Sequence, residues 1–176
     1  MPPEGSTVTF RRPAADVRPR AIAHFARKLQ REVARGRAFD CLIAGDAELR
    51  RLNREFRGKD YTTDVLSFLS AGGRALARAA LQRRYGSGAK AVPRGRPGLK
   101  PTPHLGDLAI SVQRARAQGR EFGHGTEGEI RILMLHGLLH LLGMDHESDR
   151  GRMARAELRW RKRLGLPNGL IERVSA

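Results

Sequence analysis

The segment 130–146 constrains this chain more than any other part of the sequence. It reads IRILMLHGLLHLLGMDH, so a long apolar run is interrupted by His136 and His140 and followed by His146. A helix places residues four apart on one face, one turn from each other, as it would His136 and His140. Gly143 permits a left-handed turn that brings His146 back toward the pair. The segment therefore predicts a buried helix that holds three imidazoles together at its end.

Three imidazoles in this arrangement predict a metal site on His136, His140 and His146. They are enough to hold a catalytic zinc ion, whose fourth position stays open to water that loses its proton near neutral pH. The alternative is three core histidines that bind no metal, but their buried ring nitrogens would then need other hydrogen-bond partners. Zinc is the expected metal, and nickel or another divalent metal stays an alternative, because imidazole suits zinc, nickel and copper alike.

The spacing HxxxHxxGxxH is also that of the metzincin proteases, which carry a glutamate beside the first histidine as general base. Here Gly137 stands in that position, and glycine cannot accept a proton. The sequence therefore disfavours a metallopeptidase.

The charge of the chain points to a polyanionic substrate. Lys and Arg number 34 against 18 Asp and Glu, which leaves a net charge of +16. Because the basic residues occur throughout the chain, the surface should attract nucleic acid by counterion release. The alternative is a compositional bias toward arginine in the source organism.

Several protein classes are disfavoured by composition. The single cysteine, Cys41, argues against a disulfide framework or a zinc site built on several cysteines, and we expect it in the core. No apolar run approaches the roughly 18 residues of a membrane span. The first residues lack the apolar stretch of a secretory signal. We therefore expect a cytoplasmic protein without a membrane partner.

Hydrophobic periodicity and turn residues predict the following elements. Strands are expected at 8–10, 39–43, 65–69 and 105–111, and helices at 18–35, 47–56, 112–121, 126–142 and 148–164. The segment 71–103 contains no Asp or Glu, many Arg and Lys, and several Gly and Pro. We interpret it as a basic insertion that either contacts RNA or is a tolerated surface loop.

Polar residues at the predicted helix starts are expected to cap them. Asp46 should cap the second helix, and Thr126 with Glu129 should form a capping box, in which each side chain accepts a backbone N–H. Glu147 and Asp149 should cap the last helix.

Three blocks of sequence carry a resemblance to a known family. They are HGLLHLLGMDH at 136–146, LNREFRGKDYTTDVLSF at 52–68 and LGDLAIS at 105–111. In this order they resemble the signatures of the YbeY endoribonucleases, the ribosomal RNA maturation factors. The family strand at 65–68 is typically followed by proline, whereas here Leu69 and the basic insertion follow.

The resemblance implies a single α+β domain over residues 1–176, with a small mixed sheet of about four strands and about five helices. It implies single-strand-specific cleavage of RNA, in maturation of the 16S ribosomal RNA 3′ end and in ribosome quality control. The implied partners are ribosomal RNA and the small subunit, with a ribosomal protein or an assembly GTPase as further candidates. Arg57 matches the family arginine that faces the metal cleft, and its charged fork suits phosphate. The candidate catalytic residues are thus Arg57 and His136.

Alternatives remain at three points. The nucleophile is either water at the metal or the 2′-OH of the RNA, and no general base can be named from the residues. Asp145 is either a helix cap or a carboxylate that orients a ligating imidazole. The rival function is a non-catalytic, RNA-binding ribosome-assembly factor whose metal is structural.

Overall fold

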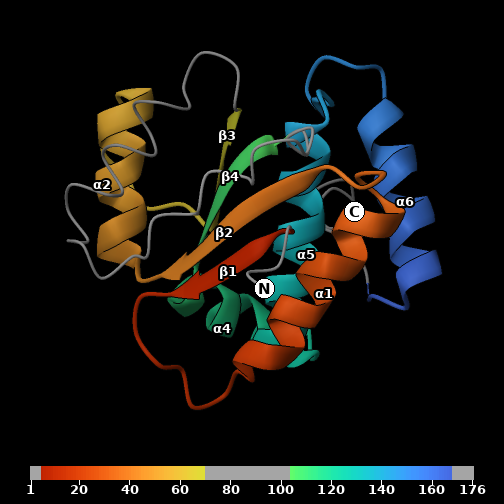
Figure 1. Ribbon diagram of the computed structural model, residues 1–176. Coiled ribbons are helices and arrows are strands. Elements are labelled where there is room, and N and C mark those ends of the chain that lie inside the picture. Colours follow the sequence, from red (N-terminus) through yellow and green to blue (C-terminus); the bar gives the residue numbers. More distant parts are fainter. Residues whose placement is uncertain (1–4, 70–103, 168–176) are drawn as a thin grey trace, which may run out of the picture.

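The computed structural model describes residues 5–69 and 104–167, in which four strands form one mixed sheet (Figure 1). The strands lie in the order β1-β2-β4-β3. β1, β2 and β4 are parallel, and β3 runs antiparallel to β4. Their bounds are β1 Thr7–Phe10, β2 Ala38–Ala44, β3 Val65–Leu69 and β4 His104–Ser111.

Helices pack on both faces of this sheet, with α1 and α5 on one face and α2 on the other (Figure 1). The helix bounds are α1 Pro19–Glu32, α2 Asp46–Arg57, α4 Val112–Glu121, α5 Gly125–Leu141 and α6 Arg152–Leu164. The expected α+β class, with about four strands and five helices, is therefore confirmed. The basic insertion predicted at 71–103 lies outside the described residues.

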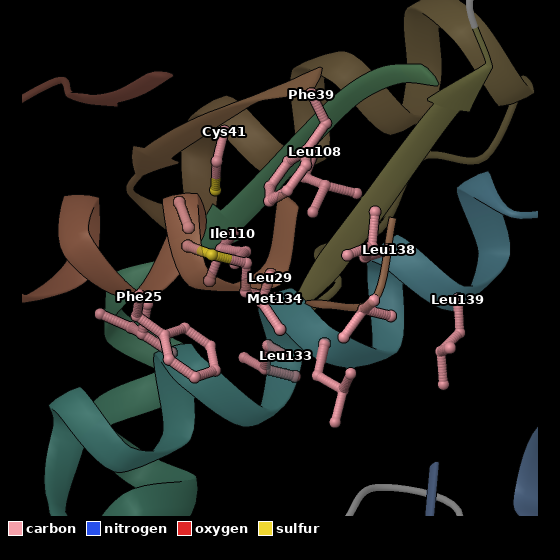
Figure 2. Packing of buried hydrophobic residues seen from close by; sticks show 14 of the residues in the cluster. Phe25, Leu29, Phe39, Cys41, Leu108, Ile110, Leu133, Met134, Leu138 and Leu139 are labelled. Carbon is pink, nitrogen blue, oxygen red and sulfur yellow. The ribbon is translucent and has the colours of Figure 1, made fainter. Parts of the chain in front are cut away.

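Strand β4 shows how the sequence builds these layers. Successive side chains of a strand point to opposite faces. Leu108 and Ile110 accordingly pack in the larger core beneath α1 and α5, while Ala109 joins Leu49 and Leu52 of α2 in the smaller one. Figure 2 shows the larger core, where side chains of β2, β4, α1 and α5 meet: Phe39, Cys41, Leu108, Ile110, Phe25, Leu29, Leu133 and Met134. Cys41 is buried there, as expected.

Helix α5 is buried on nearly every side, which agrees with its apolar sequence. A helix that is hydrophobic all round has no face suited to water, so other elements must cover it. The sheet covers one side, and α1, α4 and α6 contact the others.

No helix among the described residues is long and apolar enough to cross a membrane.

The predicted capping box at the start of α5 is wrong. The helix begins one residue earlier, and its N-cap is His124. The Thr126 hydroxyl donates to Asp16, with 2.6 Å between the oxygens. Glu129 is fully buried and meets the ring of His124. Partners from distant and flanking segments therefore replaced the local backbone contacts that the spacing indicated.

The capping prediction for Asp46 is wrong, and the one for Glu147 and Asp149 holds only for Asp149. Asp46 is the first residue of α2 and follows the N-cap Gly45, and its carboxylate accepts from the Ser111 hydroxyl. The last helix begins at Arg152 instead of 148, because the preceding residues form a turn. Asp149 does accept the N–H of Met153 in the first turn of α6, at 2.9 Å, whereas Glu147 is exposed in the turn.

Gly106 provides a test of the β3–β4 pairing. Its φ is +152°, and a Cβ added there would lie 2.0 Å from the carbonyl oxygen of Phe68. We expect Gly106→Ala to lower the free energy of unfolding by about 2–4 kcal/mol, because the strands must separate or the backbone must move. Urea unfolding followed by circular dichroism measures this loss.

Gly36→Ala is the matched control. Gly36 has a φ of +86° with nothing within 4 Å of an added Cβ, so only the left-handed conformation is penalised, by about 1 kcal/mol. Equal losses in the two variants would show that the close approach to Phe68 does not govern the pairing.

Candidate metal centre

The end of α5 and the turn after it bring three histidines together. His136 and His140 lie one turn apart on α5, and their Nε2 atoms are 3.2 Å apart. Gly143 follows the helix with a φ of +86°, the left-handed conformation expected for it. The chain turns back there, so the ring centroid of His146 lies 5.5 Å from each of the other two. One possible ligand atom from each histidine falls within 4.8 Å of the others.

Burial decreases across the cluster. His136 is only 4% exposed, His140 is half-buried, and His146 is exposed in the turn. The three rings therefore form a group that is closed on the protein side and open to solvent at His146. A centre with an open side can admit a substrate or water beside a bound metal.

Glu157 of α6 fixes the most buried ring. Its Oε2 lies 2.8 Å from Nδ1 of His136, and the residue is only 1% exposed. A ligating histidine commonly donates its other ring N–H to a carboxylate, which sets the tautomer and the ring orientation. Donation from Nδ1 leaves the Nε2 lone pair of His136 directed at the other histidines.

A backbone carbonyl orients the second ring in the same way. Nδ1 of His140 lies 3.0 Å from the carbonyl oxygen of Met144, which can only accept a hydrogen bond. Burial lowers the pKa of His140, and the neighbouring rings of His136 and His146 lower it further, since a second positive charge there is unfavourable. His140 therefore favours the neutral form, which is the form that binds metals.

These contacts make the donor set fit a divalent metal. With Nδ1 of each ring engaged as a donor, two Nε2 lone pairs face each other at 3.2 Å. Two acceptors at that distance repel unless a cation or a proton lies between them. A divalent cation bound by all three imidazoles satisfies both lone pairs at once.

The carboxylates near His146 shape the turn. The Asp145 carboxylate accepts from the Ser148 hydroxyl at 2.7 Å and from the Glu147 N–H at 3.1 Å. These bonds lower the pKa of Asp145, and the nearby rings of His140 and His146 lower it further. Asp145 thus stabilises the turn that carries His146, and Glu157 is the carboxylate that bonds to a ring of the cluster.

The role of Glu157 is not predicted from the sequence, where only acidic residues close to His146 are candidates for orienting a ligand. One signal was available: Glu157 is the only acidic residue in α6, and it lies beside Ala156 and near Met153 on the apolar face of an otherwise basic helix. An acidic residue on a buried face needs a buried partner.

Gly137 faces the sheet and not the three histidines. A Cβ on Gly137 would lie 2.8 Å from Leu108 and 3.2 Å from Val65, and the Ser67 hydroxyl donates to the Gly137 carbonyl at 3.2 Å. A glutamate at this position would not fit against β3 and β4. The carboxylate base of a metzincin is therefore sterically excluded as well as absent.

Arg57 is not brought close to the histidines by a described contact. It is the last residue of α2, is exposed, and belongs to the helix on the opposite face of the sheet from α5. Its role toward phosphate stays a prediction.

A second group of possible ligands lies on the sheet. It consists of Asp40 of β2 with His104 and Asp107 of β4, and one possible ligand atom from each lies within 4.8 Å of the others. Oδ2 of Asp40 is 3.1 Å from Nε2 of His104. The spacing along the sequence does not group these residues, because only the pairing of β2 with β4 makes Asp40 and Asp107 neighbours.

Comparison with known proteins decides the family. A family model described as "Endoribonuclease YbeY" matches residues 10–165. The chain belongs to the endoribonuclease YbeY family. The resemblance inferred from three sequence blocks is thereby confirmed, together with the endoribonuclease class that it implied.

Individual YbeY relatives agree with the family model. Endoribonuclease YbeY of Solibacter usitatus is 60% identical over 174 residues, which cover 99% of this chain and 98% of the relative. Endoribonuclease YbeY of Nautilia profundicola is 40% identical over 135 residues, covering 76% and 77%. The solution structure of TM1509 from Thermotoga maritima shares the fold, with a TM-score of 0.51 at 20% identity over 88% of this chain and 85% of that one.

Replacing Glu157 tests its effect on the centre. Glu157→Gln keeps the shape of the side chain but removes the carboxylate charge that faces Nδ1 of His136. We expect zinc affinity to fall about 10–100-fold, as for other carboxylates that bond to a ligating histidine. Competition with a chromogenic chelator at fixed pH measures the affinity.

Glu147→Gln removes the same charge from the exposed turn beside His146. We expect it to leave zinc affinity nearly unchanged. If both variants weakened zinc equally, general electrostatics and not the Glu157–His136 contact would be responsible.

Proposed function

We propose that this protein is a zinc-dependent endoribonuclease that cuts single-stranded RNA during maturation of ribosomal RNA. The observation that carries the proposal is the convergence of His136, His140 and His146, with one open side, in a chain of the endoribonuclease YbeY family. Phosphodiester cleavage needs a group that stabilises charge on phosphoryl oxygens, and a cationic centre open to solvent suits that need.

The three histidines would hold the metal, and the chain supplies the orientation. Bound zinc would supply Lewis acidity toward a phosphoryl oxygen and would lower the pKa of water. His136 and His140 present Nε2 because Glu157 and the Met144 carbonyl engage their Nδ1 atoms. The exposed side at His146 is where an RNA phosphate would approach.

The biological setting follows the family resemblance and the charge. A net charge of +16 favours association with RNA, and we propose ribosomal RNA of the small subunit, cut at its 3′ end, as the substrate. The ribosomal small subunit, a ribosomal protein or an assembly GTPase would be partners in the cytoplasm. Nickel or another divalent metal could replace zinc, because imidazole binds all of them.

A non-catalytic assembly factor is the competing function. Structural zinc sites are closed by four protein ligands, whereas the described residues offer three imidazoles here and an exposed side. This geometry favours catalysis over a purely structural metal.

Cleavage of a single-stranded RNA by purified, zinc-loaded protein tests the proposal. Several kcal/mol of barrier reduction are assigned to the metal, so His136→Ala or chelation should lower the rate by at least about 100-fold. His24→Ala, which changes an exposed histidine of α1, should keep full activity. Metal content is measured for each sample.

The outcomes separate the candidates. No cleavage by zinc-loaded protein, free or in the presence of small subunits, would support the assembly factor. Cleavage that survives both His136→Ala and chelation would mean that the histidine centre is not responsible.

Arg57→Ala tests the proposed phosphate contact. Loss of a charge-assisted bidentate contact costs about 1.5–3 kcal/mol, so we expect cleavage to fall about 10–100-fold while zinc content is unchanged. Arg27→Ala removes an exposed arginine of α1 and should have little effect. Equal rates for the two variants would remove Arg57 from the mechanism.

A further inference from the structure

We propose that one exposed face of α6 binds the phosphate backbone of single-stranded RNA and leads it to the histidine centre. This face, the α6 basic stripe, consists of Arg152, Arg155, Arg159, Lys162 and Arg163. The inference rests on the proposed endoribonuclease function and adds where on the protein the substrate strand lies.

The stripe follows from the spacing of its residues. Steps of three and four residues keep them on one side of a helix, and all five are exposed. They extend over about 17 Å at 1.5 Å per residue. The apolar face of α6 is turned inward, where Met153 and Ala156 are buried. The only acidic residue of the helix, Glu157, is also buried and is bonded to His136.

The stripe begins beside the candidate centre. Helix α6 starts six residues after His146. Glu157, in the second turn of α6, contacts His136 with 2.8 Å between Oε2 and Nδ1. Arg155 reaches back over the intervening turn, where its Nη1 donates to the carbonyl of Arg150 at 3.2 Å. A strand bound along the stripe therefore arrives at the turn that carries the exposed ligand.

The charges of the stripe are not neutralised within the described part of the protein. Several other arginines are paired with carboxylates, for example Arg116 with Asp16 and Arg51 with Glu48 and Glu55. Among residues 5–69 and 104–167, no acidic side chain forms an ion pair with the stripe. A guanidinium without an internal carboxylate can contact phosphate without first breaking an ion pair.

The stripe would act in positioning and not in chemistry. Contacts between arginine and phosphate are independent of base sequence and depend strongly on salt, because counterions are released from the nucleic acid. Such contacts suit an enzyme that must hold a single strand near one scissile bond. The histidines and the metal would remain the reacting centre.

The test is the salt dependence of binding by the full-length, zinc-loaded protein. The probe is a fluorescent, single-stranded 2′-O-methyl oligoribonucleotide, whose integrity is checked on a gel. For the triple variant Arg152→Gln, Arg155→Gln, Arg159→Gln we expect about tenfold weaker binding at low salt. The slope of log K against log salt should become shallower by about 2, since each lost phosphate contact contributes about 0.7.

A matched triple variant controls for net charge: Arg20→Gln, Arg27→Gln, Arg120→Gln. Arg20 and Arg27 are exposed on α1 and Arg120 is exposed on α4, so none of them lies on α6. We expect this variant to bind almost as the wild type does. Lysine at all three α6 positions should largely restore binding, because the charges return.

The proposal is overturned if the two glutamine triples weaken binding equally, since diffuse charge would then account for the affinity. It is also overturned if the α6 triple variant binds RNA as the wild type does. The stripe would then not bind RNA, and an acidic protein would become its candidate partner. Zinc content and melting temperature should be unchanged in each variant. Because binding is measured without cleavage, failure of the stripe and failure of the proposed function give different results.

Discussion

Burial of α5 on nearly every side is the constraint on which the rest of the structure depends. From Ile132 to Leu141 its only polar side chains are His136 and His140, so a sheet and further helices must surround this part of the helix. Gly137 lets the helix approach the sheet closely, since a Cβ there would be 2.8 Å from Leu108. This close approach presses the histidine-bearing half of α5 against β3 and β4. The fold is therefore organised around one helix, with α2 covering the far face of the sheet.

The same burial determines what the histidines can do. A polar group in such surroundings must be hydrogen-bonded, and the partners here are Glu157 for His136 and the Met144 carbonyl for His140. Both partners engage Nδ1, so both Nε2 atoms are directed at a common point. Since α5 ends there and Gly143 turns the chain, His146 completes the group from the solvent side. A buried imidazole and a solvent-exposed one thus meet at the end of one helix.

Much of the fold could be predicted from local pattern. The strand at 65–69 and the helix at 112–121 agree with their predicted bounds, because apolar periodicity and flanking turn residues are local signals. Local rules failed where distant or flanking side chains competed for the same polar group. The Thr126 hydroxyl bonds to Asp16 across 110 positions, and Glu129 bonds to His124 instead of capping the helix. Glu157 escaped prediction for the same reason, since its partner lies 21 residues away.

The sequence by itself determined that three histidines belong together, because helical spacing and a glycine turn are properties of one short segment. It also determined the family, since three blocks matched in order. Only the tertiary structure decided which carboxylate orients His136, why Gly137 admits no side chain, and which arginines lie on an exposed face beside the centre. The physical reason is that the periodicity of a helix or strand depends only on residues that are close together in the sequence. The partner of a buried polar atom depends instead on which distant segments pack against it.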